Sequence, residues 1–528
     1  MRSLPLRALF IAVVSCGLAL ALATPTIAGP TDPVVLALPP SGQGDAFVPG
    51  TRPLDPGYVE EEYLVSGAAD LFNYANDPPL GPTDITAIQS AVPYQTRMIV
   101  RRPSSLGAFN GTVVIEWWNS TAGFDTAPVW DASAEHFQRE GYIYVGVTNS
   151  TTSLGFLVGG CSLFGILPPT CGTRYATLSL PENGLAFEMM SQIANLLKSD
   201  SVENPIPADF GVDRIFHSGQ SQQGGSMVTY ASAFHFPVND GYFIQQAATA
   251  RDINFGPVCG AQGSPPFPDC TPELQFPDNL VRTDLPVPVV HAISETDIEI
   301  LFGTVGRQAD TDTFRYYEVA GASHLTVHKG TELIPAGVIG PDPLLLEDLC
   351  QFEINSTADG PVFFSYVLNA LWDGLEDQVT SGTDMPDGRI MDVLGGVVQR
   401  DAFGNGLGGV RPPSVEVPQA TYTPGNSADP NLPPFLQQIG NLACFLASSV
   451  TPLDAATLDG LYPNHGIYVS QVIQSSNQAR SDGFLLPKDR KKIVNAAAGS
   501  SIGCGMGFEV ALLLPAWLWL RGRRRASA

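Results

Sequence analysis

The stretch that decides the fold reads Asp213-Arg-Ile-Phe-His-Ser-Gly-Gln-Ser-Gln-Gln-Gly-Gly225. It predicts a short buried strand that turns sharply at Ser221 and continues as a helix over 227–236. A serine hydroxyl is a weak nucleophile, so it must stand exposed where a base can take its proton. A strand–turn–helix with serine at the apex, the nucleophile elbow, meets that need. The alternative is a Gly/Ser turn that opens an ordinary helix.

Small residues are expected two positions on either side of the serine, because the tight turn crowds the backbone there. Gly219 satisfies this on one side. On the other side stands Gln223, and Gly224 comes one position later. The pattern is therefore G-x-S-x-x-G in place of the usual G-x-S-x-G.

An acid is expected after a later strand. The run Val287-Pro-Val-Val-His-Ala-Ile293 is continuous, apolar and β-branched, which predicts a buried strand, and it leads into Ser294-Glu-Thr-Asp297. A carboxylate just past a strand end can reach a histidine on the next loop. Asp297 is the predicted acid and Glu295 the second choice. The alternative for Asp297 is that it caps the N-terminus of a helix that begins at Ile298.

A histidine follows the next predicted strand, 313–319, through the small-residue loop Ala320-Gly-Ala-Ser-His324. In this position His324 would be the general base that takes the Ser221 proton and later delivers it to the leaving group. The alternative is a loop histidine whose hydrogen bonds are purely structural. The order serine, acid, histidine is the one that accompanies a nucleophile elbow.

An oxyanion hole requires backbone N–H groups near the nucleophile. The residue directly after the serine, Gln222, should supply one of them. The second should come from the loop 119–123, which follows the predicted strand Thr112-Val-Val-Ile-Glu-Trp-Trp118. Asn119 and Ser120 are both candidates, and an ordinary Asn-Ser turn is the alternative.

Together these segments resemble the large secreted branch of α/β-hydrolase-domain proteins, whose substrates are mostly unassigned. In that family the elbow is typically G-x-S-Q-S-G, so Ser221 and Gln222 match while Gln223 replaces a smaller serine. The resemblance implies a serine hydrolase and names no substrate. The matching segments are 111–119, 219–224, 294–297, 318–324, 401–412, 415–422, 462–468 and 482–487.

Strands that alternate with helical stretches predict an α/β fold with a mostly parallel sheet covered on both faces, as in an α/β-hydrolase. We expect this domain over residues 29–494. Inserts are expected at about 154–173 and 250–283. A third, at about 333–468, should pack on the core as a lid.

The N-terminus predicts export. A short basic segment, Met1 to Arg7, precedes an apolar run over 8–23 and small residues around Ala28, as in a secretory signal peptide over 1–28. A lipoprotein cleavage box at Cys16 is the alternative.

The C-terminal segment, residues 495–528, predicts a signal that directs the protein to the cell envelope. Gly503-Cys-Gly precedes the apolar stretch 510–520 and the arginine cluster 521–525. This layout resembles bacterial sorting signals of the myxosortase type, in which a sorting protease processes the tail near the cysteine, here Cys504. We therefore expect C-terminal anchoring at the cell envelope and surface. A simple tail anchor is the alternative, although the apolar stretch is short for a permanent span.

Six cysteines remain once Cys16 and Cys504 are set aside, and an even number in an exported chain predicts disulfides. Fifteen pairings are possible, and proximity in the sequence favours one of them. The expected pairs are Cys161 with Cys171, Cys259 with Cys270, and Cys350 with Cys444.

Charge excludes several partners. The net charge is −25 with 27 Lys+Arg, which argues against nucleic acid and anionic lipid. No motif predicts a cofactor, and no cysteine lies near a histidine at the spacing of metal ligands. We expect a small-molecule or lipid-like ester substrate, and contact with the membrane only through the tail.

Two classes of function remain open at this stage. One is an exported serine hydrolase that acts on an ester, a lactone or an amide. The other is a catalytically inactive, surface-anchored binding protein with the same fold. Since a decayed enzyme usually loses one catalytic position and all three are filled here, the sequence favours the enzyme.

Overall fold

The computed structural model of the chain describes most of residues 33–500. The described ranges are 33–36, 42–76, 81, 83–162, 170–253, 280–325, 332–334, 342, 344–354 and 364–500. The predicted signal peptide, the expected Cys259–Cys270 pair and the tail around Cys504 lie outside these ranges. Within them, none of the helices combines the length and the apolar character needed to span a bilayer.

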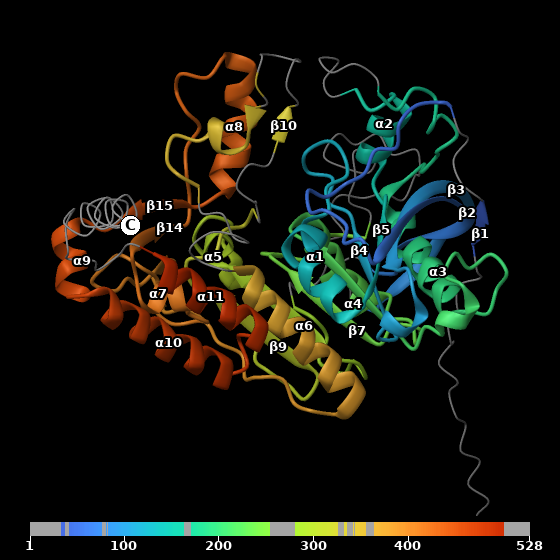
Figure 1. Ribbon diagram of the computed structural model, residues 1–528. Coiled ribbons are helices and arrows are strands. Elements are labelled where there is room, and N and C mark those ends of the chain that lie inside the picture. The colour runs from blue at the N-terminus through green and yellow to red at the C-terminus, as the bar shows by residue number, and fades with distance from the viewer. Residues whose placement is uncertain are drawn as a thin grey trace, which may run out of the picture.

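A nine-stranded sheet forms the centre of the molecule (Figure 1), with strand order β1-β2-β3-β5-β4-β6-β7-β8-β9. The six neighbouring strands β5, β4, β6, β7, β8 and β9 are parallel to one another. Strands β1, β2 and β3 run antiparallel to their neighbours. The strands are β1 (Val34–Leu36), β2 (Tyr58–Tyr74), β3 (Ile85–Pro103), β4 (Thr112–Trp117), β5 (Ile143–Val147), β6 (Arg214–Gln220), β7 (Gly241–Gln245), β8 (Val289–Ser294) and β9 (Phe314–Val319). This mostly parallel sheet confirms the predicted α/β fold class.

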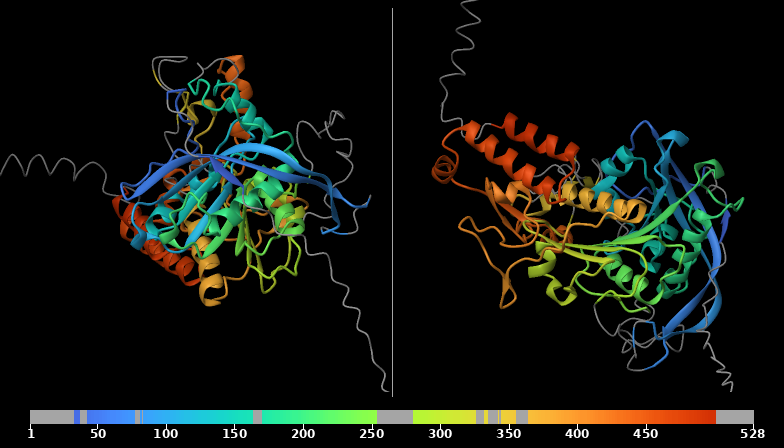
Figure 2. Two further views of the ribbon diagram at one scale, coloured as in Figure 1. Left: turned by 90° about the vertical axis from the view of Figure 1, so that its right-hand side faces the viewer. Right: turned by 90° about the horizontal axis from the view of Figure 1, so that it is seen from below.

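Helices cover both faces of the sheet (Figure 2). Successive side chains of a strand point to opposite faces, so each strand presents apolar side chains to both helical layers. On one face, Trp372 of α6 (Phe364–Ser381) packs against Phe216 of β6 and Phe243 of β7, and also against α1 (Pro128–Glu140). On the other face, Tyr230 of α4 (Gln222–Ala233) packs against His217 and Trp117, beside α3 (Ala186–Lys198). Strands buried on both faces are why the sequence shows continuous apolar runs.

Helix α4 begins at Gln222, directly after the serine, and not at residue 227 as the sequence predicted. Its first turn contains Gly224 and Gly225, which are poor helix formers. A Cβ atom at Gly224 would lie 2.6 Å from the carbonyl oxygen of Gln245, and one at Gly225 would lie 2.6 Å from that of Thr249. The glycines are therefore explained by the close passage of the chain that follows β7.

The long β2–β3 hairpin was not predicted, although it adds strands of 17 and 19 residues. Charged residues interrupt the apolar pattern of β3. The guanidinium of Arg97 is fully buried and pairs with Glu62 at 2.9 Å and with Asp125 at 3.0 Å. A buried charge compensated by partners distant in sequence gives no local signal of a strand.

The segment after β9 only partly behaves as the expected insert. Helix α6 belongs to the layer that covers the sheet, whereas α8 (Pro434–Leu446) lies beside the loop that carries His324. The N–H of Leu325 donates to the carbonyl oxygen of Leu446 at 3.1 Å, and the N–H of Ser448 donates to the Ser323 hydroxyl at 3.0 Å. This part of the segment therefore packs around the site.

The remaining α-helices and the short strands lie around this core. They are α2 (Thr151–Val158), α5 (Glu295–Glu299), α7 (Pro413–Glu416), α9 (Ala455–Leu461), α10 (His465–Ser481), α11 (Pro487–Gly499), β10 (Glu332–Ile334), β11 (Leu344–Leu345), β12 (Val393–Leu394), β13 (Val397–Val398), β14 (Ala420–Thr423) and β15 (Ser449–Pro452).

Two of the three expected disulfides fall within the described residues, and both are formed: Cys161–Cys171 and Cys350–Cys444. They close loops of very different length, with sequence separations of 10 and 94. A cross-link reduces the entropy of the unfolded chain more when the loop is longer.

Replacement of both Cys350 and Cys444 by serine is expected to lower the free energy of unfolding by about 2–4 kcal/mol. The matched replacement of Cys161 and Cys171 should cost roughly 2 kcal/mol less, because loop entropy grows with the logarithm of loop length. Calorimetric melting temperatures of the two double variants would test this. An equal or larger loss for the short loop would contradict it.

Candidate functional site

The backbone at Ser221 adopts a conformation that is rare for a residue with a side chain, with φ of 58° and ψ of −120°. Such strain persists only where the surrounding structure imposes it, and it is frequent at functional sites. Here the N–H of Ser221 donates to the carbonyl oxygen of Gln245 at 3.0 Å, and α4 begins at the next residue. The turn thus presents the serine side chain at the carboxyl edge of the parallel strands.

The crowding expected around the elbow falls mainly on Gly219. A Cβ atom there would lie 2.6 Å from the carbonyl oxygen of Gln223, so a side chain at position 219 is excluded. Gln223 itself is accommodated because it already lies in the helix and is buried along the flank of α4. The departure from the G-x-S-x-G pattern is therefore compatible with a sharp turn.

Ser221, His324 and Asp297 form one hydrogen-bonded chain, although they come from three separate segments: the turn before α4, the loop after β9 and the first turn of α5. His324 Nε2 lies 2.8 Å from Ser221 Oγ, and His324 Nδ1 lies 2.6 Å from Asp297 Oδ1. His324 and Asp297 are almost fully buried, while Ser221 keeps partial exposure. The geometry fits an imidazole that donates from Nδ1 to the carboxylate and accepts from the serine hydroxyl at Nε2.

Asp297 also holds the start of helix α5. Its Oδ2 accepts hydrogen bonds from the N–H of Ser294 at 2.7 Å and from the Ser294 hydroxyl at 2.5 Å. The N–H of Asp297 donates in return to the Ser294 hydroxyl, which completes a capping box. The N-cap of α5 is therefore Ser294 and not Asp297. Asp297 lies in the first turn of the helix, where its hydrogen bonds to Ser294 coexist with the contact to His324.

Glu295 points to different partners. Its Oε2 accepts from the N–H of Gly321 at 2.6 Å, and its Oε1 forms an ion pair with Arg400. Burial raises the pKa of Glu295, and Arg400 opposes this shift. Glu295 therefore supports the start of the histidine loop, and the carboxylate on His324 is that of Asp297.

Two buried glutamines, which the sequence analysis did not select, hold the backbone of the histidine loop. The side-chain N–H of Gln220 donates to the carbonyl oxygen of His324 at 3.0 Å. That of Gln246 donates to the carbonyl oxygen of Ser323 at 2.7 Å. Both glutamines follow buried strand residues, and a polar side chain at the end of an apolar strand is the signal that could have identified them.

Hydrogen bonds distinguish the two candidates for the second oxyanion donor. The N–H of Asn119 donates to the carbonyl oxygen of Thr126 at 3.1 Å, and its side-chain amide donates to Gln220. The N–H of Asn119 is thus engaged within the loop, and its side chain is engaged with β6. The Ser120 hydroxyl donates to the side chain of Gln222 at 3.1 Å, so these two residues lie together. The N–H of Gln222 lies in the first turn of α4, where backbone donors lack an acceptor within the helix.

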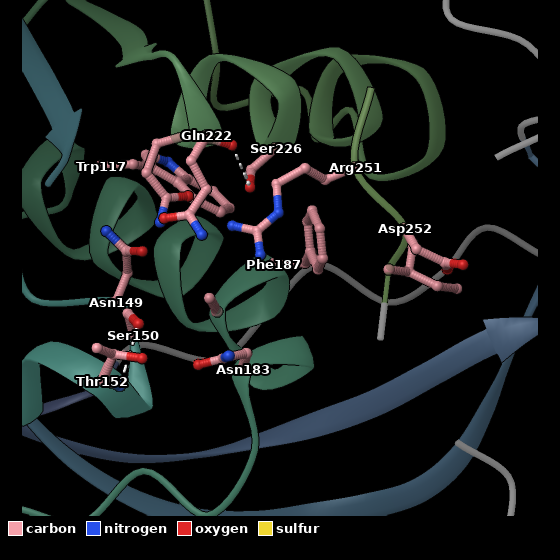
Figure 3. Close-up of a pocket in the computed structure, with 13 residues that line it drawn as sticks. Trp117, Asn149, Ser150, Thr152, Asn183, Phe187, Gln222, Ser226, Arg251 and Asp252 are labelled. Carbon is pink, nitrogen blue, oxygen red and sulfur yellow. Dashed lines mark hydrogen bonds between the residues drawn. The ribbon is translucent and has the colours of Figure 1, made fainter. Parts of the chain in front are cut away.

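A cavity of about 160 Å³ lies along the flank of α4 (Figure 3) and reaches Gln222, the residue that follows the nucleophile. Trp117 and Phe187 supply its aromatic surface, and Gln222 and Gln223 connect it to the elbow. Amide and hydroxyl groups make up most of the remaining lining, together with Arg251. Among the residues that the structure describes, no group of three or more His, Cys, Asp or Glu side chains could hold a metal ion.

Comparison with known proteins gives a family-level match. Residues 28–495 match a family model described as "Alpha/beta hydrolase domain". Among solved structures, the chain is similar to a putative dienelactone hydrolase from Klebsiella pneumoniae (13% identity, 44% of this chain and 74% of that chain, TM-score 0.21). It is also similar to a dienelactone hydrolase from Anabaena variabilis (14% identity, 45% and 85%, TM-score 0.25). A third similar structure is a rice cell wall degrading esterase from Xanthomonas oryzae (11%, 36% and 43%, TM-score 0.20). No curated protein matches the chain significantly.

Proposed function

Because the chain belongs to the alpha/beta hydrolase domain family, we propose that it is a serine hydrolase that cleaves a carboxylic ester or lactone, with amides as a further substrate class. The observation that carries the proposal is the chain of hydrogen bonds from Ser221 through His324 to Asp297. The strained backbone of Ser221 supports it, since it presents the hydroxyl at the head of α4.

In the proposed reaction the Ser221 oxygen attacks the substrate carbonyl carbon while His324 Nε2 accepts the hydroxyl proton. Asp297 keeps the imidazole in the required tautomer and stabilises the imidazolium that forms. The N–H groups of Gln222 and Ser120 would donate to the developing oxyanion. His324 then protonates the leaving alcohol, and water, activated by the same histidine, releases the acid from the acyl-enzyme.

The proposal is tested by covalent labelling. A fluorophosphonate probe should label the purified protein once per chain, and peptide mass spectrometry should locate the adduct on Ser221. A panel of short p-nitrophenyl esters should then show turnover. Absence of labelling together with absence of turnover would favour the inactive binding protein.

We further propose that the protein is exported and anchored at the cell envelope through its C-terminal tail. The support is the sequence alone: an N-terminal signal peptide, the apolar stretch 510–520 and the arginine cluster 521–525. The proposed catalytic residues all precede residue 325, so the tail should contribute nothing to turnover.

Truncation before Gly503 is expected to release active enzyme into the medium of the native host, whereas the full chain stays with the envelope. Replacement of Cys504 by serine should leave unprocessed protein in the membrane fraction. Immunoblots and esterase activity of the medium and membrane fractions measure both effects. Normal processing and display of the Cys504→Ser variant would show that Cys504 is not needed for sorting.

A further inference from the structure

The cavity beside the elbow has an uneven distribution of charge. Asn149, Asn183, Gln222 and Gln223 line it with neutral amides, and Arg251 is the only basic side chain among its described lining residues. The chain as a whole carries a net charge of −25, so its general field repels anions. A cation at this place therefore changes what the site can bind.

Arg251 is held in place by contacts of its backbone with α4. Its N–H donates to the carbonyl oxygen of Gly225 at 3.1 Å, and its carbonyl oxygen accepts from the Thr229 hydroxyl. Gly225 permits this approach, because a Cβ atom there would lie 3.0 Å from Cγ of Arg251. The base of the side chain is thus fixed one turn from the nucleophile.

The guanidinium points into the cavity, toward Phe187 and Gln222, whereas the other charged lining residue, Asp252, points away from it (Figure 3). Burial lowers the pKa of Arg251 to about 9, so the group stays charged at neutral pH while much of its hydration is lost. Guanidinium groups bind carboxylates in a bidentate manner, so a charged group at this place favours an anionic ligand.

Size restricts what the cavity holds. Its volume of about 160 Å³ is close to that of a cavity known to hold one benzene molecule, roughly 150 Å³. A short chain that ends in a carboxylate is therefore of a size that this pocket can hold.

We propose that Arg251 binds a carboxylate carried by the substrate, and hence that the natural substrate is a small anionic ester or lactone. This specificity rests on the proposed serine hydrolase function, because it concerns the same site. The carboxylate would occupy the cavity and orient the reacting carbonyl toward Ser221. Arg251 is then a specificity-determining residue that contacts the substrate away from the reacting atoms.

The test compares two esters of equal acyl length, monoethyl succinate and ethyl butyrate, in which a carboxylate replaces a methyl group. Proton release in a pH-stat gives kcat/KM for each. The native enzyme should prefer the anionic ester, and Arg251→Gln should reduce that preference about 10- to 100-fold, as expected for the loss of a charged hydrogen bond. Arg251→Lys, which keeps the charge without the bidentate geometry, should fall between them.

The matched control is Arg282→Gln, which removes one positive charge outside the cavity, where Arg282 pairs with Asp284. A preference that survives in Arg251→Gln, or that falls equally in Arg282→Gln, would overturn the proposal. Melting temperatures of all variants show whether a loss reflects unfolding, and in that case Arg251→Lys decides.

A binding measurement separates this inference from the proposed function. Isothermal titration of monoethyl succinate into the Ser221→Ala variant should show binding that the added Arg251→Gln change weakens at least tenfold. If ethyl butyrate is hydrolysed but Arg251→Gln changes neither the preference for the anionic ester nor its binding, only the inference about Arg251 is contradicted. Binding that depends on Arg251, without turnover or fluorophosphonate labelling, would contradict the proposed hydrolase function and still support the anion site.

Discussion

Replacement of Ser221 by alanine is expected to lower kcat for ester hydrolysis by roughly 10⁴- to 10⁶-fold, the range typical of a lost triad nucleophile. The hydroxyl is the attacking group, and no neighbouring side chain can replace it at 2.8 Å from His324 Nε2. The fold should be almost unaffected, since alanine keeps the Cβ atom and the residue is partly exposed. The melting temperature should therefore stay within a few degrees of that of the native protein.

Steady-state turnover of p-nitrophenyl butyrate and fluorophosphonate labelling measure this effect. Ser218→Ala is the control, because Ser218 lies on β6, the strand that leads into the elbow, but its hydroxyl donates to the carbonyl oxygen of Phe243. The control should still be labelled and active. Turnover at the native rate in Ser221→Ala would exclude the assignment of the nucleophile.

Asp297→Asn is expected to lower kcat by about 10⁴-fold, as for the orienting acid of other triads. An asparagine keeps the shape of the side chain but removes the charge that stabilises the imidazolium. Its amide group can also face Nδ1 of His324 as a donor, which favours the wrong tautomer. The pH–rate profile of the variant should show this loss at every pH at which the protein stays folded.

Glu295→Gln serves as the comparison for Asp297→Asn, because both variants neutralise a buried carboxylate two residues apart. Glu295 contacts Gly321 and Arg400, so its loss should act mainly on the stability of the fold. We expect a lower melting temperature and only a small decrease in kcat. Circular dichroism melts and the same ester assay distinguish the two outcomes. If the glutamine variant is inactive and the asparagine variant is not, the roles assigned to the two acids are wrong.

The sequence predicted the parallel part of the sheet well, because strands that are buried on both faces consist of continuous apolar residues. The predicted strand over 112–118 is β4, and the one over 313–319 is β9. The three residues proposed for the triad follow strands whose carboxyl ends meet at one edge of the sheet, so they could be selected by order alone.

What escaped prediction depends on contacts between distant segments. The β2–β3 hairpin contains the buried Arg97, whose partners Glu62 and Asp125 lie 35 and 28 residues away in the sequence. Gln220 and Gln246 act on a loop about 80 to 100 residues later in the chain. Arg251 became a candidate only when the fold placed it beside Phe187. The sequence around these residues shows neither a periodic pattern nor a motif that would predict such contacts.

The division of Asp297 between two tasks has a consequence for the reading of variant libraries. One carboxylate oxygen serves His324 and the other serves Ser294, so a substitution at either end disturbs the same group. A saturation screen scored by growth on an ester would rank position 294 with the triad, although Ser294 contacts the carboxylate and not the histidine. For this chain, sensitivity to substitution and direct participation in chemistry are therefore separate properties, and only kinetics on purified variants can tell them apart.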